Sequence, residues 1–150
     1  MVAELAKPPW VTEVDGIDVG VEALENRRID DFNQAFGQRR LLIVDPGLMG
    51  QSGHHLSHDR AIATEAQRRT IPTLILGFAG CDPSVMRQTC AVRHFGIQPY
   101  ARLDVNATAE QEFATANEIF LHYLQKLPVR LGPNDTVLFP TVTQNHHHMR

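Results

Sequence analysis

The fold is decided by the stretch from Leu41 to Gly77, which reads LLIVDPGLMGQSGHHLSHDRAIATEAQRRTIPTLILG. The apolar run Leu41–Asp45 ends at a Pro-Gly pair and is typical of a strand buried between two helix layers. After a glycine-bearing loop, an alanine-rich segment without Gly or Pro predicts a helix over His54–Arg69, whose start Ser52 could cap. The run Thr73–Leu76 predicts a second buried strand. Strand, loop, helix and strand form one βαβ unit, whose crossover is expected to be right-handed.

The segments on either side extend this alternation of helices and strands. A helix can form over Val21–Phe36, and a short helix is expected from Asp82-Pro83 to about His94. A short strand can form near Ala101–Leu103. The capping box Thr108–Gln111 opens an amphipathic helix to about Lys126, and Thr136–Phe139 predicts a further buried strand. We therefore predict an α/β protein, a Rossmann-like three-layer sandwich with a small, mostly parallel sheet. Residues 1–38 are expected to be a poorly defined lead-in in which a helix can form, and residues 39–150 the Rossmann-like domain.

Composition excludes several classes of protein. The chain has 150 residues, a net charge of −3 and a pI near 6.2, so no overall field attracts nucleic acid, and its arginine pairs are too dispersed for a nucleic-acid stripe. Its mean hydropathy is −0.22 and its apolar runs are far shorter than the roughly 20 residues that span a bilayer. No secretory signal is visible, and two cysteines cannot form a disulfide framework. These features predict a cytoplasmic protein without a membrane span.

The loop after the first predicted strand is the first candidate site. Its three glycines are spaced G-x-x-G-x-x-G, at Gly47, Gly50 and Gly53. In doubly wound folds ligands bind beyond the carboxyl ends of the strands, where glycines allow close backbone approach and helix N–H groups favour an anion. The spacing differs from the dinucleotide-binding fingerprint, and the lysine of a P-loop is missing. A tight strand-to-helix turn without a ligand remains the alternative.

Three histidines stand where the next helix is expected to begin. His54 and His58 are i, i+4 neighbours and could share one helix face, as zinc ligands do. However, the His-Glu-x-x-His pattern is absent, and no Cys-x-x-Cys pair or suitably spaced carboxylate supplies further ligands. His146–His148 could contribute only if the tail folds back. We therefore predict no specific metal site and no cofactor, with adventitious binding of nickel or zinc by the tail.

Single carboxylates and a cysteine are weaker candidates. Asp45 and Asp104 end apolar runs, where functional carboxylates often occur, but each is equally suited to capping a turn. Cys81 precedes an expected helix and could be a thiolate there. No His or Asn is placed beside it by the sequence, which favours a structural cysteine.

The segment quoted above resembles the N-terminal half of GT-B-fold glycosyltransferases, most closely the bacterial enzymes of the retaining, group-1 type. The resemblance covers Leu41–Gly77 well, through LLIVD, Gly53-His54-His55, EAQRR and TLILG, and Ala109–Phe139 loosely. It implies that Gly50 and Gly53 form the glycine turn near the donor diphosphate, that His54 or His55 is the cleft histidine, and that this domain mainly holds the acceptor. The spaced glycines depart from the adjacent pair usual in the family.

The resemblance also implies a second domain that would carry the nucleotide pocket, and the chain stops where the first domain would end. The leading hypothesis is therefore an acceptor-side domain that transfers a glycosyl group from a nucleotide-sugar only when a second domain or partner chain completes it. Its ligand-binding residues would be Gly50, Gly53, His54 and His55, and its catalytic residues are unknown. The isolated chain is expected to be inactive. The alternatives are a non-catalytic α/β module that binds an anionic ligand at the glycine loop, and a histidine-rich metal binder. Unpaired sheet edges predict self-association or a partner chain.

Overall fold

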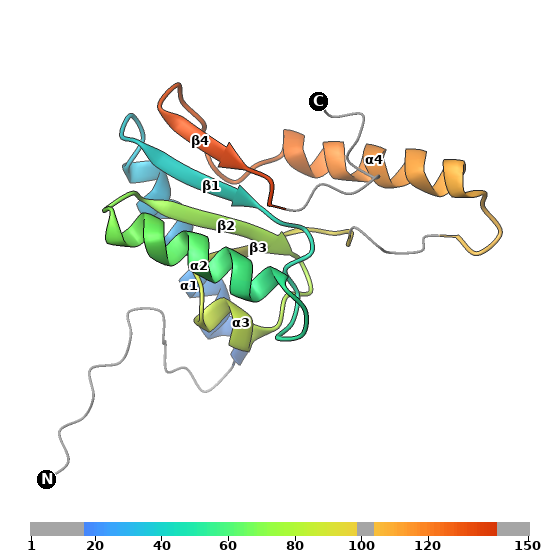
Figure 1. Cartoon of the computed structure of the whole chain (residues 1–150), viewed down its shortest axis with the longest axis horizontal. Coiled ribbons are helices and arrows are strands. Elements are labelled where there is room, and N and C mark those ends of the chain that lie inside the picture. Colours follow the sequence, from blue (N-terminus) through green and yellow to red (C-terminus); the bar gives the residue numbers. More distant parts are fainter. Residues whose placement is uncertain (1–16, 99–103, 141–150) are drawn as a thin grey trace, which may run out of the picture.

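The protein is an α/β Rossmann-like sandwich built on a four-stranded, all-parallel sheet (Figure 1). The computed structural model describes residues 17–98 and 104–140. In chain order, the elements are α1 (Ile17–Gln34), β1 (Arg40–Val44), α2 (His55–Arg68), β2 (Thr73–Phe78), α3 (Pro83–Arg87), β3 (Ala91–Phe95), α4 (Ala109–Gln125) and β4 (Asp135–Leu138). The strands lie in the order β3-β2-β1-β4. None of the helices in these two ranges is long and apolar enough to cross a bilayer.

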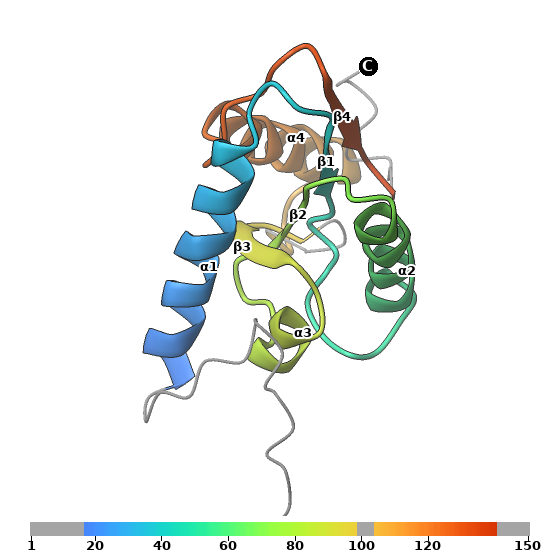
Figure 2. The ribbon, with the colours of Figure 1, turned by 90° about the vertical axis from the view of Figure 1, so that its left-hand side faces the viewer.

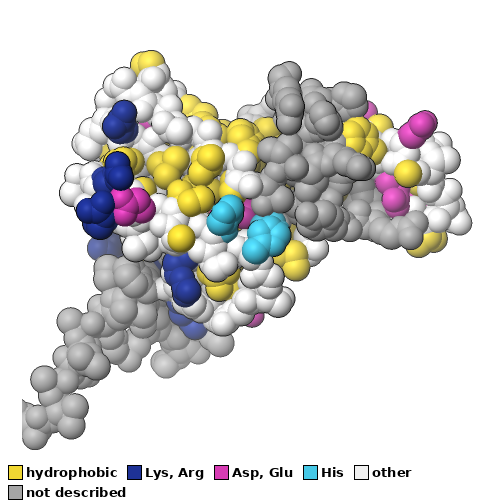
Figure 3. Space-filling model, viewed as in Figure 1, with side chains coloured by type: hydrophobic (Ala, Val, Ile, Leu, Met, Phe, Trp, Pro, Cys, Tyr) yellow, Lys and Arg dark blue, Asp and Glu magenta, His cyan; other side chains and the backbone are white. Residues whose placement is uncertain are grey.

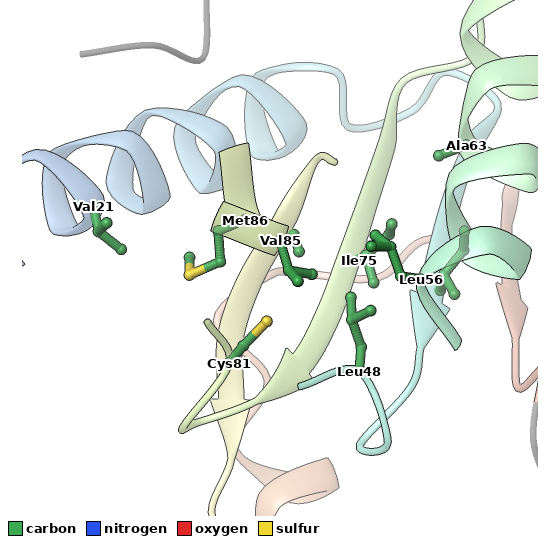
Figure 4. Packing of buried hydrophobic residues seen from close by; sticks show 10 residues of the cluster. Val21, Leu48, Leu56, Ala63, Ile75, Cys81, Val85 and Met86 are labelled. Carbon is green, nitrogen blue, oxygen red and sulfur yellow. The ribbon is translucent and has the colours of Figure 1, made fainter. Parts of the chain in front are cut away.

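Helices cover both faces of the sheet, which explains why the central strands are apolar throughout (Figure 2). On one face, Ile43 and Ile75 pack with side chains of α2 and α3 (Figure 4). On the other face, Leu42 and Val44 belong to a second core that includes Phe32 of α1 and Phe120 of α4. Because side chains alternate along a strand, the residue after Val44 points back toward α2. That residue is Asp45.

The strand order creates a switch point between β1 and β4. The chain leaves β1 through α2 to reach β2, whereas it reaches β4 from β3 through α4, which packs on the opposite face. Val44 pairs with Leu76 and Ile43 with Leu138, so Asp45 stands just beyond the carboxyl edge beside this switch point. Open α/β sheets bind ligands beyond the carboxyl ends of the strands at such switch points.

A buried arginine ties both ends of the described chain together at the opposite edge of the sheet. The guanidinium of Arg40 donates to both carboxylate oxygens of Asp135, at 2.8 and 2.6 Å, and to the carbonyl oxygens of Phe32 and Arg130, both at 2.6 Å. It also lies 4.2 Å from the centre of the Phe32 ring. These bonds to Arg40 hold the pKa of Asp135 below its usual value. α1, β1 and the turn before β4 are therefore joined by one side chain.

The βαβ unit, the capping box at Thr108 and the Asp82-Pro83 helix opening are confirmed. The expected helix to His94 is wrong: α3 ends at Arg87, and Ala91–Phe95 forms β3, because Val92 and Phe95 are buried against the sheet. The expected Ser52 cap is also wrong, since α2 has His54 at its N-cap without a side-chain cap. The last predicted strand forms but lies at an edge, with Val137 exposed.

Other sequence predictions are extended, untested or outside the described residues. The N-terminal helix is longer at its start than expected, and Val21, Leu24 and Phe32 from it join the core. The domain division at residue 38 stays a prediction. The short strand expected at Ala101–Leu103 and the run His146–His148 fall outside the residues that the structure describes.

Candidate functional site: a buried carboxylate and histidine at the end of β1

The loop between β1 and α2 is held in place by bonds to neighbouring elements. Leu48 inserts its side chain into the core, and its carbonyl oxygen accepts a hydrogen bond from Phe78 N at 3.1 Å. The carbonyl of Met49 accepts from Asp82 N, at the N-cap of α3, at 2.6 Å. The loop therefore has a defined conformation between the ends of β1, β2 and α3, and it can position side chains for a ligand.

Asp45 and His55 form a hydrogen-bonded pair at the two ends of this loop. Nδ1 of His55 lies 2.8 Å from Oδ2 and 3.0 Å from Oδ1 of Asp45, and Oδ1 also accepts from Gly47 N at 2.9 Å. The Asp45 side chain is 1% exposed and that of His55 13%. Since a carboxylate can only accept, Nδ1 carries a proton, and Nε2 is the ring nitrogen that Asp45 leaves unused. Asp45 thus caps the turn and orients the histidine at once.

Gly47 leaves the space in which the His55 ring lies. A Cβ on Gly47 would come within 2.7 Å of Nε2 and 2.8 Å of Nδ1 of His55, so any larger residue would displace the ring. By contrast, a Cβ on Gly50 would meet nothing within 4 Å, and Gly53 is set apart by its positive φ of 89° rather than by crowding. The glycine that approaches a functional group closely is therefore Gly47, a member of the candidate loop, whereas the predicted ligand-binding glycines are Gly50 and Gly53.

Asp59 places a second carboxyl beside Asp45. Its side chain is fully buried, and within residues 17–98 and 104–140 neither oxygen has a partner in regular hydrogen-bonding geometry. Burial, followed by the charge of nearby Asp45, raises the pKa of Asp59 to about 9. Asp59 is therefore protonated at neutral pH.

Of the predicted ligand-binding residues, only His55 is hydrogen-bonded to Asp45. His54 is exposed and stacks on His55 with ring centres 4.5 Å apart, and the His58 ring lies 6.5 Å from His54 in an edge arrangement. Figure 3 shows histidine side chains on the surface of this part of the molecule. Gly50 and Gly53 are loop residues without a close neighbour for a Cβ. In the described part of the chain, no three His, Cys, Asp or Glu side chains are grouped so that they could hold a metal ion.

The remaining candidates have structural surroundings. Cys81 is buried, and burial raises the pKa of its thiol to about 12, so it stays protonated and is a poor nucleophile. Asp104 is exposed and accepts a hydrogen bond from Asn106 N at 2.9 Å, as expected of a residue that caps a turn. Asp59 carried a signal that was overlooked. It falls on the same stripe of α2 as Leu56, Ala63 and Ala66, where an acidic residue is out of place.

Comparisons with known proteins do not identify the chain. No protein-family model matches it, and neither curated proteins nor solved structures include a significant match. The geometry of the site must therefore support any functional proposal.

Proposed function

We propose that this protein is an acceptor-side domain for glycosyl transfer, which binds a hydroxyl-bearing acceptor beyond the carboxyl ends of β1 and β4. The observation that carries the proposal is the hydrogen bond between Asp45 and His55 at this edge. The resemblance in Leu41–Gly77 supplies the reaction class, and the pair supplies a chemical role for the histidine that the resemblance assigns to the cleft.

The role follows from the orientation of the imidazole. A histidine whose Nδ1–H is fixed by a carboxylate presents Nε2 in a defined direction as a hydrogen-bond acceptor. Nε2 of His55 has no hydrogen-bond partner among the described residues. A sugar hydroxyl can donate to it, and the hydroxyl oxygen is then oriented for attack on the anomeric carbon. As the new glycosidic bond forms, the hydroxyl proton passes to Nε2 of His55, and the bond from the anomeric carbon to the donor diphosphate breaks, so that a nucleoside diphosphate leaves.

The donor surface is proposed to come from a second domain or a partner chain. Positioning of the donor supplies much of the rate enhancement in a reaction between two bound substrates. We therefore expect chain 1–150 alone to bind acceptor sugars but to release no nucleoside diphosphate above background from a panel of nucleotide-sugars.

Saturation-transfer NMR with a panel of mono- and disaccharides tests the acceptor site. We expect binding of at least one sugar by the wild type, and roughly tenfold weaker binding after His55→Ala, which removes the acceptor nitrogen. His54→Ala is the matched control, because it removes the neighbouring exposed imidazole and leaves the pair with Asp45 intact. Equal losses in both variants, or binding of inorganic diphosphate and no sugar, would contradict the proposal; the second result would favour the anion-binding module.

A pair of glycine variants tests the same site through its shape. Gly47→Ala places a methyl group where the His55 ring lies, so the ring must leave Asp45 and sugar binding should fall as it does in His55→Ala. Gly50→Ala adds the same methyl group to the same loop in open space and should bind like the wild type. Unchanged sugar binding by a folded Gly47→Ala protein would show that the orientation of His55 is irrelevant.

A further inference from the structure

A cavity lies apart from the Asp45–His55 site, beside the start of β3. It has a volume of about 320 Å³ and is lined by side chains of α1, α2 and the turn that leads from α3 into β3. It shares no residue with the loop between β1 and α2. A volume of this size suits a small ligand.

Arginine side chains dominate the charge of this cavity. Arg27 and Arg28 line it from α1 and Arg60 from α2, and Asp31 is the acidic residue of its lining. Cys90 also lines it, but burial raises the pKa of the thiol to about 11, so the thiol is uncharged at neutral pH. Three positive charges and one negative charge leave the cavity with a net charge of +2. A partly enclosed cavity with a net positive lining strengthens the electric field that a small anion experiences.

Arg28 is held in position and is not fully paired. Its Nη1 donates to the carbonyl oxygen of Ala91 at 2.6 Å, while its Nη2 is buried and has no hydrogen-bond partner in the described ranges. The nearby carboxylate of Glu25 is already bound by Arg93, through N–H groups of both its backbone and its guanidinium at 2.7 Å. Burial lowers the pKa of Arg28 only to about 10, which keeps the guanidinium charged. A fixed, charged donor without a partner is costly unless a ligand pairs with it.

Arg60 approaches the cavity from the other side with a weaker restraint. Its Nη1 donates to Oε1 of Gln88 at 3.2 Å, across the exposed surface between α2 and the end of α3. The guanidinium planes therefore come from two helices that lie on opposite faces of the sheet (Figure 2). Planar forks of this kind bind phosphate and carboxylate groups with two parallel hydrogen bonds.

We propose that this cavity binds the phosphate group of a small phosphorylated molecule. A phosphate monoester carries a charge of about −2 near neutral pH, which matches the charge of the lining, whereas a single carboxylate carries half as much. Phosphate oxygens can accept from Arg28 and Arg60 together, and Thr64 and Gln67 offer polar groups to the remainder of the ligand. The site is independent of the acceptor-binding function proposed above.

Isothermal titration of the whole chain with ribose 5-phosphate, and with ribose as the matched compound without phosphate, tests the proposal. We expect saturable binding of ribose 5-phosphate that weakens as salt is added, and no binding of ribose. Arg60→Gln and Arg27→Gln replace exposed side chains and should each weaken binding about tenfold, as loss of a charged hydrogen bond does. Arg28→Gln should weaken it further, provided that circular dichroism shows the variant to be folded.

Two controls separate this cavity from general charge and from the site on β1. Arg68→Gln removes the same charge from α2 outside the cavity lining and should leave the affinity unchanged, and so should His55→Ala. Failure of the wild type to bind ribose 5-phosphate would overturn the proposal. So would an equal loss of affinity in Arg60→Gln and Arg68→Gln, since it would show attraction to surface charge rather than a site.

Discussion

At the level of single residues, Asp59 has the least expected environment in the molecule. An acidic side chain in the apolar stripe of a helix loses its hydration and gains little in return unless a partner compensates for the loss. Its neighbour is a second carboxyl, Asp45, whose oxygens are already used by His55 and Gly47. Asp59 can therefore remain buried only in its protonated form. The folded protein binds a proton here that the unfolded chain releases at neutral pH.

This proton predicts how stability changes with pH. The pKa of Asp59 rises from about 3.9 in the unfolded chain to about 9 in the folded state. Its contribution to stability is thus complete below the unfolded pKa and is lost as pH rises toward the folded pKa. Asp59→Asn keeps the shape and removes the ionisation. We expect its free energy of unfolding to exceed that of the wild type by a margin that grows by up to about 1.4 kcal/mol per pH unit between pH 5 and 8.

Urea unfolding at several pH values measures this margin. Asp104→Asn is the matched control, because Asp104 is exposed and its substitution should give a difference that does not change with pH. A margin for Asp59→Asn that is the same at pH 5 and pH 8 would show that Asp59 is ionised in the folded protein.

The sequence points to two members of the candidate site, and the other members depend on contacts that the sequence does not show. His55 is one of two predicted histidines that follow the glycine loop, and Asp45 is a weaker candidate that is equally suited to capping a turn. Their hydrogen bond depends on the path of the loop between them, and the distance between the two residues in the sequence does not predict that path. Gly47 is named in the candidate loop but not among the ligand-binding residues, because the need for a glycine there comes from the position of the His55 ring. Asp59 could have been found from the helix period alone.

At the level of elements, Arg40 shows how β1 is joined to α1 and to β4. A buried arginine needs partners for its donors, and four of the five N–H groups of Arg40 have them in Asp135, Phe32 O and Arg130 O. We expect Arg40→Met to lower the free energy of unfolding by about 3 kcal/mol or more, because Asp135 is left buried and unpaired. Urea denaturation measures the loss.

Two further variants show whether the unpaired charge is the cause. Arg40→Met combined with Asp135→Leu should recover part of the loss, since no charge then remains buried without a partner. Arg68→Met removes an arginine from an exposed ion pair with Glu65 and should leave stability unchanged. A double variant less stable than Arg40→Met would show that Asp135 stabilises the fold through other contacts, such as its bond to Gly132 N.

Strands and helices were predictable where a local signal was strong. The reciprocal bonds between Thr108 and Gln111 fix the start of α4, and Pro83 fixes that of α3. β3 was missed because its residues, AVRHF, carry neither a clear alternation nor a turn signal at their start. Its conformation is imposed by pairing with β2 and by burial of Phe95, which are contacts between distant segments.

At the level of the whole molecule, the sheet has one central pair of strands and two edges. β1 and β2 are paired on both sides, whereas β4 pairs only with β1 within residues 17–98 and 104–140. Val137 in β4 and Phe139 just after it are exposed, at 37% and 40%. An apolar edge strand with free backbone groups is a template for a further strand. The expectation of a second domain or partner chain therefore applies most directly to this edge.

We predict that the isolated chain associates with itself through β4 and that a charge on this edge prevents it. Lysine on an edge strand opposes the approach of another strand because its charge would be desolvated on pairing. Sedimentation velocity should show a mass that rises with concentration for the wild type and stays monomeric for Val137→Lys. Leu121→Lys places the same charge on α4, at a residue that is 45% exposed, and should associate like the wild type. If Leu121→Lys also became monomeric, the interface would lie on α4 or be a general apolar contact. A wild type that is monomeric at every concentration would show that the β4 edge does not pair with a second copy.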